Sequence, residues 1–120
     1  MIVVDPKNIK LEEAKNDPMV QNGPIFRQLL VDGKVSGGYS IAVVKYTAGT
    51  RLNWHTHDSE QIIMGTEGKG IMATREKEQI VTPGMVVVVP AGEVHYHGAA
   101  KDSSFTHIAF YSGKSVVLPK

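Results

Sequence analysis

The sequence predicts an all-β domain with the layout of a sandwich or a barrel. From Ile25 onward the chain is built of short segments rich in Val, Ile, Thr and Tyr. Glycine and proline separate these segments, and turn signals spaced by about 8–12 residues are typical of such folds. Strands are therefore expected near residues 25–31, 39–47, 51–56, 59–66, 69–74, 77–82, 85–89, 94–98 and 104–112.

The first 24 residues differ in character and are interpreted as an N-terminal arm, 1–24, ahead of a domain at 25–120. Residues 2–4 are apolar and predict a short strand, which Pro6 ends because proline lacks the amide needed for pairing. Asn8 is a candidate N-cap, and the residues after it, up to Lys15, are rich in helix formers. We therefore expect a brief helix at 8–15.

Composition narrows the classes of function. A chain of 120 residues, 42% hydrophobic and 21% charged, fits one soluble globular domain. The longest aliphatic run, Met85–Val89, is far shorter than the roughly 20 residues of a membrane span, and the start has no basic targeting region, so we expect a cytoplasmic location. A net charge of +1 with scattered Lys and Arg argues against nucleic acid as a partner.

The histidines are the candidates for chemistry. The chain has no cysteine, so any metal must be held by nitrogen and oxygen. Side chains two apart on a strand share a face, so the pair His55 and His57 and the pair His95 and His97 each present two imidazoles to one side. If the two strands face each other, up to four imidazoles converge, which predicts a site for one divalent transition metal, with Mn, Fe, Ni, Zn and Cu all open.

The spacing around the first pair resembles the first motif of the cupin family. Five residues separate Gly49 from His55, His57 follows, Gln61 comes three residues later, and Gly68 six residues beyond that. Gln61 stands where the family motif has glutamate.

The second cupin motif is matched further along the chain. Gly84, Pro90, Gly92 and His95 fall at the motif's positions, and Ala99 stands where the motif has asparagine. A joint match in the right order is far more specific than either motif alone.

The resemblance implies a small cupin with a jelly-roll fold and a metal held by His55, His57, Gln61 and His95. Such cupins commonly dimerise through N-terminal or edge strands, so a homodimer is expected, with residues 2–4 as a candidate contact. An amide in place of a carboxylate leaves the metal's charge less compensated, which favours an anionic small-molecule substrate. Gln61 can instead orient an imidazole, and Glu60 is expected to be a solvated charge on the opposite face.

Two histidines remain as candidate catalytic residues. His97 should face the pocket although the family motif does not use it for metal, and an imidazole with a pKa near its ordinary value of about 6.5 can move protons at neutral pH. His107 shares a strand face with Phe105 and Ala109. It either joins the pocket wall or is a hydrogen-bonded core residue.

The resemblance leaves the reaction open between several classes. The pattern of His55, His57 and Gln61 is similar to cupins of uronate metabolism, and the run 93–99 is similar to cupins associated with carboxymuconolactone decarboxylases. The leading hypothesis is a metal-dependent enzyme acting on a small carboxylate or carbonyl compound, an isomerase or a decarboxylase-like lyase. An iron-dependent dioxygenase and a non-catalytic metal-dependent binding module are the alternatives.

Overall fold

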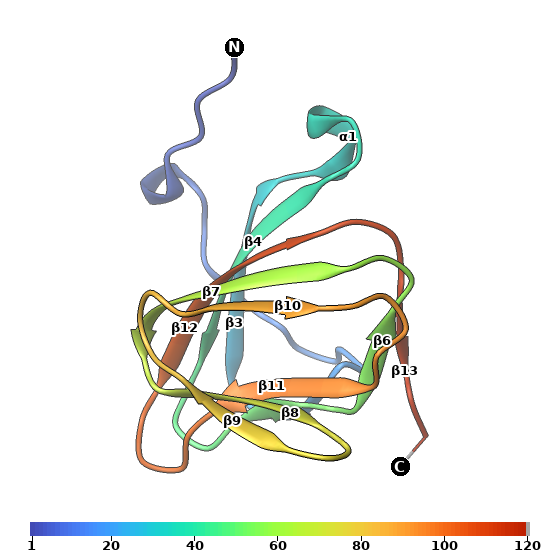
Figure 1. Cartoon of the computed structure of the whole chain (residues 1–120). Coiled ribbons are helices and arrows are strands. Elements are labelled where there is room, and N and C mark those ends of the chain that lie inside the picture. Colours follow the sequence, from blue (N-terminus) through green and yellow to red (C-terminus); the bar gives the residue numbers. More distant parts are fainter. Residues whose placement is uncertain (120) are drawn as a thin grey trace.

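The computed structural model describes residues 1–119 as two antiparallel β-sheets packed face to face (Figure 1). The predicted all-β jelly-roll class is confirmed. The six-stranded sheet has the spatial order β1 (Glu12–Glu13), β3 (Ile25–Val31), β4 (Ser40–Tyr46), β12 (Phe105–Tyr111), β7 (Gln61–Gly68) and β10 (Val86–Val89).

The second sheet carries most of the histidines. Its path runs β13 (Ser115–Val117), β6 (His55–His57), β11 (His95–Ala99), β5 (Arg51–Leu52) and β2 (Val20–Asn22), and β8 (Gly70–Thr74) pairs with β11 and with β9 (Glu78–Val81). Because β5 and β6 both pair with β11, two separate pieces of chain meet on one edge of that strand.

The N-terminal segment differs from the sequence-based expectation. In place of a helix at 8–15 there is a 3₁₀ turn, η1 (Pro6–Asn8), and then strand β1. Asp5 caps the turn by accepting a hydrogen bond from the Lys7 amide at 2.9 Å. Residues 8–15 have helix propensity, but two of them form β1 and pair with β3 instead. Tertiary contacts often override local propensity in this way. The expected strand at 2–4 is not formed.

Other boundaries also differ. The expected strand at 51–56 is divided into β5 and β6, and the strand expected from 59 begins at 61. Strands β2 and β13 were not expected at all. Within residues 1–119 the one α-helix is α1 (Gly33–Ser36), a single turn between β3 and β4 that projects from the top of the barrel in Figure 1. Among residues 1–119, no helix is both long and apolar enough to cross a bilayer.

The core lies between the two sheets. Four of its most deeply buried members belong to the six-stranded sheet: Ile25, Tyr46, Ile63 and Phe105 are at most 2% exposed. The second sheet contributes Leu52, Met72, Val81 and Ala99 to the same cluster. Tyr46 and Phe105 are stacked with ring centroids 6.0 Å apart. The histidines line the space beside this packed region, so the sheets that form the core also fix the site.

Candidate metal centre

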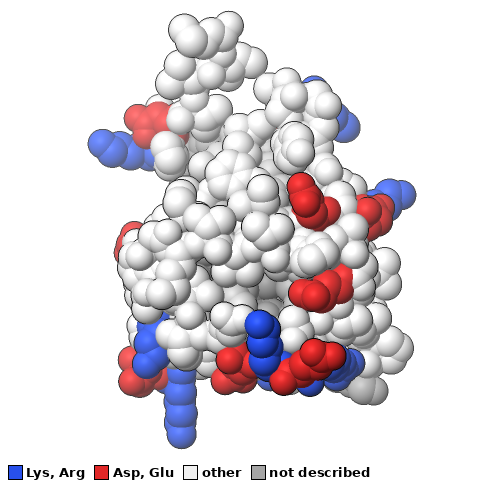
Figure 2. Space-filling model, in the orientation of Figure 1, with Lys and Arg blue, Asp and Glu red and all other residues white. Residues whose placement is uncertain are grey.

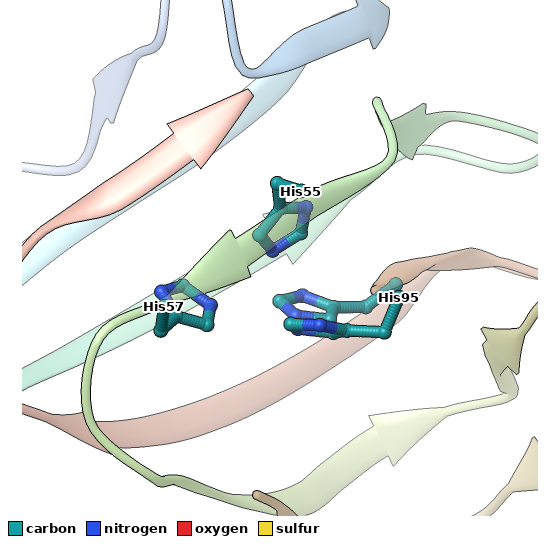
Figure 3. Close-up of side chains that lie close together, drawn as sticks. His55, His57 and His95 are labelled. Atoms are coloured by element: carbon teal, nitrogen blue, oxygen red, sulfur yellow. The ribbon is translucent and has the colours of Figure 1, made fainter. Parts of the chain in front are cut away.

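Antiparallel pairing of β6 with β11 sets His55 directly opposite His95. His57 and His97 lie two residues along their strands and therefore project to the same side. Candidate ligand atoms of these four side chains all lie within 4.8 Å of one another. Figure 3 shows the rings of His55, His57 and His95 turned towards a common point between the strands.

Gln61 reaches the same region from the other sheet. After His57 the chain leaves β6, passes through the exposed residues Asp58 and Glu60, and enters β7 at Gln61. The Gln61 side chain is 5% exposed and lines one cavity with His55 and His57. The sequence predicts a separate strand for Gln61, at 59–66, and the structure places this strand in the opposite sheet from the histidine pair. Glu60 is exposed, as expected.

Backbone carbonyls set the tautomers of two imidazoles. His55 Nδ1 lies 2.7 Å from the carbonyl oxygen of Asn53, and His95 Nδ1 lies 2.8 Å from that of Glu93. A carbonyl oxygen only accepts, so each Nδ1 carries the proton and each Nε2 presents a lone pair. Partners of this kind orient metal-ligating histidines in many proteins.

The atoms that face the centre of the cluster lack partners. The Nε2 atoms of all four imidazoles and Gln61 Oε1 are buried without a hydrogen bond among residues 1–119. Each such buried polar atom costs about 1–3 kcal/mol if it stays unsatisfied. A divalent transition metal accepts lone pairs from imidazole nitrogen and amide oxygen, so the donor set fits such an ion.

The protonation states agree with metal binding. Burial, together with the neighbouring His95 and His57, lowers the pKa of His55 to about 4. Burial and His95 likewise lower the pKa of His57 to about 4. The pKa of His95 is lowered by burial, and that of His97 is held well below its ordinary value by burial and by the surrounding imidazoles. All four are therefore neutral at pH 7, the form that binds metal.

Two glycines hold the histidine segments together. Gly92 has a φ of +80°, a conformation that favours glycine, and its amide donates to the His57 carbonyl oxygen at 2.8 Å. At Gly98, a Cβ atom would lie 2.6 Å from the Thr50 carbonyl oxygen, so only glycine lets β5 approach β11 this closely. The ends of the two histidine strands are thus anchored by backbone contacts.

His107 enters from β12 and connects to the cluster through a tyrosine. Its Nε2 lies 3.0 Å from the Tyr46 hydroxyl, which also lies 3.2 Å from His97 Nδ1. Burial lowers the pKa of His107 to about 3 and raises that of Tyr46 above its usual range. Sequence reasoning singled out both histidines and missed Tyr46. Its one signal, the alternation with Ala42 and Val44 on β4, does not show which face looks inward.

A cavity of about 110 Å³ opens beside the cluster. Its lining includes His55, His57, Gln61, His97 and His107, whereas His95 borders a second hollow against β8 and β10. The rest of the lining is mostly apolar, with Ile25, Ala42, Val44, Leu52, Ala109 and Tyr111 among it.

The charged lining residues of this cavity form a pair. Arg27 Nη2 lies 2.7 Å from Asp17 Oδ2. Their charges offset each other, so the cavity has little net charge of its own.

The chain is similar in sequence or in structure to several known proteins. The chain is 40% identical over 80 residues to an (R)-mandelonitrile lyase of Granulicella tundricola, a match that covers 62% of this chain and 60% of that protein's length. A cupin-like protein from Thermotoga maritima superposes with a TM-score of 0.83 at 29% identity, covering 92% of this chain and 87% of that one. A polyketide cyclase from Streptomyces resistomycificus gives a TM-score of 0.83 at 16% identity over 100% of this chain and 87% of its own, which is a likeness of fold.

The family model for the cupin domain matches residues 42–111. This stretch runs from β4 to the end of β12 and contains all five histidines, Tyr46 and Gln61. It also covers both motifs, so the fold, the motifs and the family match agree. The chain belongs to the cupin family.

Proposed function

We propose that this protein is a metal-dependent lyase that splits a small compound carrying a hydroxyl or carboxylate group next to the bond that breaks. One observation carries the proposal: imidazole nitrogens that have no hydrogen-bond partner in the described part of the chain, residues 1–119, converge beside a cavity that is otherwise mostly apolar. Such a cavity binds the carbon skeleton of a small molecule and presents its polar end to the cluster.

The metal would be held by His55, His57, His95 and the Gln61 amide oxygen. When bound, a divalent transition metal supplies Lewis acidity towards a substrate oxygen. None of these ligands carries a charge, and the charges of Asp17 and Arg27 in the cavity wall offset each other. The loaded site is therefore strongly positive and favours an anionic substrate or leaving group.

His107 and His97 are the groups proposed to move protons. In the cleavage of a hydroxy compound, His107 takes the hydroxyl proton and the hydroxyl carbon becomes a carbonyl carbon. The bond to the leaving carbon breaks, and its electron pair departs with that carbon, which then takes up a proton from His97. No oxidant is needed, so the step is a lyase reaction.

The relative from Granulicella tundricola supports this class of reaction. Its name describes the cleavage of a hydroxynitrile, in which the departing carbon belongs to cyanide, an ionised small leaving group. The present chain covers 60% of that protein's length. That this chain acts on the same substrate is therefore our proposal and does not follow from the similarity alone. Decarboxylation of a hydroxy or keto acid needs the same polarised oxygen and proton donor.

The experiment is a cleavage assay with matched metal forms. Metal-stripped protein is reloaded separately with Mn²⁺, Fe²⁺, Ni²⁺, Zn²⁺ or Cu²⁺, and benzaldehyde release from mandelonitrile and CO₂ release from small hydroxy and keto acids are followed. The double variant His55→Ala, His57→Ala is the control. We expect cleavage above this control with at least one metal and without oxygen uptake. No cleavage with any metal, or turnover that consumes oxygen, rejects the proposal.

We further propose that the chain forms a homodimer through the outer face of the six-stranded sheet. Side chains that alternate with the cavity-lining residues form an apolar row across four neighbouring strands, in register: Val86, Val88, Ile62, Met64, Ile108, Phe110, Ile41 and Val43. Val86 and Val88 are each 59% exposed. Figure 2 shows a dense row of charged side chains along the lower edge of the view and an uncharged region in the middle left above it. A broad apolar face of this kind commonly marks a protein interface.

A further inference from the structure

Tyr46 occupies a special place between two histidines. It is 1% exposed, and the two partners of its hydroxyl are His97 Nδ1 and His107 Nε2, at 3.2 and 3.0 Å. The far nitrogens of the two rings, His97 Nε2 and His107 Nδ1, are buried without partners among residues 1–119. Both rings line the cavity. The three side chains therefore form a short chain of hydrogen bonds whose two ends are free.

Counting protons on this chain restricts its states. Each neutral imidazole has one N–H and the hydroxyl has one O–H, so the two hydrogen bonds use two of the three protons. The third proton points outward from one end. Either His97 Nε2 or His107 Nδ1 bears it, and the nitrogen at the opposite end then has a lone pair.

Any other arrangement of the protons on His97, Tyr46 and His107 is less favourable. If both rings donate to Tyr46, its own proton has no acceptor, and if neither donates, two lone pairs face each other. Each leaves a buried polar group unsatisfied, at a cost of about 1–3 kcal/mol. A phenolate is not an alternative, because burial raises the pKa of Tyr46.

We propose that Tyr46 couples His97 and His107, so that the two rings always share the same tautomer and offer opposite ends to the cavity, one a proton donor and one an acceptor. When both carry the proton on Nδ1, His107 is the donor and His97 Nε2 is free. When both carry it on Nε2, His107 Nδ1 is the acceptor and His97 is the donor.

Exchange between the two states moves a proton without changing the charge. A proton taken up at His107 Nδ1 lets Nε2 pass its own proton to Tyr46. The tyrosine proton goes to His97 Nδ1, and the His97 Nε2 proton leaves. One proton enters and one departs.

In the proposed lyase reaction, this exchange would carry a proton from the substrate hydroxyl, through His107, Tyr46 and His97, to the departing carbon. That use rests on the proposed function, whereas the shared tautomer does not. Tyr46 is in this sense a positioning residue, because it acts on the substrate only through the two rings.

The tautomers can be measured directly. In protein labelled with ¹⁵N-histidine, the two ring nitrogens of each residue have shifts that distinguish Nδ1–H from Nε2–H. We expect His97 and His107 to show the same tautomer, both in metal-free protein and after loading with diamagnetic Zn²⁺. Opposite tautomers overturn the proposal whether or not any activity is found.

The variant Tyr46→Phe keeps the ring and removes the hydroxyl. We expect the ring-nitrogen shifts of both histidines to change together, while those of His55 and His95, which are fixed by backbone carbonyls, stay unchanged. Tyr96→Phe is the control, because the Tyr96 hydroxyl bonds to Glu78 outside the cluster.

Unchanged shifts at both rings in folded Tyr46→Phe protein reject the link. If that variant does not fold, the wild-type spectrum still decides. With an active enzyme, the variant should lose about 100-fold in kcat with little change in KM or metal content.

Discussion

His55 and His95 lie opposite each other across β6 and β11, with ring centroids 4.3 Å apart. Each donates its Nδ1 proton to a carbonyl two residues before it, so both Nε2 lone pairs face the shared space. Two fixed lone pairs directed at one point repel each other unless a cation or a proton lies between them. Because burial disfavours protonation of either ring, a metal ion is the favoured way to satisfy them.

Metal removal should therefore destabilise the protein. Chelation is expected to lower the melting temperature, and readdition of the metal at 100 times its Kd should restore about 2.7 kcal/mol of stability. Calorimetry with elemental analysis measures both quantities. The double variant His55→Ala, His57→Ala should bind no metal and show no shift. Stoichiometric metal in that variant after purification contradicts the assigned site.

Changing Gln61 to glutamate should alter charge with little change in shape. The added carboxylate compensates the metal's charge, so Gln61→Glu is expected to raise metal affinity about tenfold and to weaken an anionic ligand such as cyanide or acetate. Isothermal titration measures both. Glu60→Gln is the matched control, since Glu60 is exposed and should change neither. An unchanged response in both titrations would show that Gln61 does not contact the metal.

The sequence predicted the histidine face well because strand periodicity is local. His55 with His57, and His95 with His97, project to one side for reasons that each short strand contains by itself. The turn residues between the strands were also readable. These two local signals account for the fold class and for the candidate imidazole cluster.

Long-range contacts account for what the sequence did not reveal. Gln61 lies in the other sheet because the chain changes sheets at 58–60, which no periodicity announces. Strand β13 pairs with β6 and brings Ser115 Oγ to 2.8 Å from His57 Nδ1. The Tyr46 hydroxyl contacts His97 and His107, which are separated from it by 51 and 61 positions in the sequence. A local sequence pattern cannot indicate contacts over such separations.

The metal-free protein should lose stability in mild acid. Burial lowers the pKa of His55 and His57 to about 4 and that of His107 to about 3, whereas unfolded histidine titrates near 6.5. Between these values the unfolded chain binds more protons, so stability is full above pH 6.5 and is lost as the pH falls towards 4. At pH 5 each of these histidines costs on the order of 2 kcal/mol. Urea unfolding at pH 7.5 and 5 measures the loss, and equal midpoints would contradict it.

His107 should affect turnover more than metal binding. Its imidazole lines the cavity and is proposed to take the proton of the substrate hydroxyl. It does not belong to the four-imidazole cluster of His55, His57, His95 and His97. His107→Gln is therefore expected to lower kcat by about 10²–10⁴-fold with metal content unchanged. The matched comparison is His95→Gln, which should lose metal. A His107 variant that keeps full kcat removes this residue from the reaction.

The apolar outer face of the six-stranded sheet should hold two copies of the chain together. Val86 and Val88 are both exposed at the edge strand β10, so the double change Val86→Lys, Val88→Lys places like charges in the proposed interface without disturbing the core. We expect a dimer in wild-type protein and a monomer in this variant, as measured by light scattering at matched concentrations. Val116→Lys is the control, because Val116 has the same 59% exposure on β13 of the other sheet. A wild-type monomer, or dissociation caused by the Val116 change alone, rejects this face as the interface.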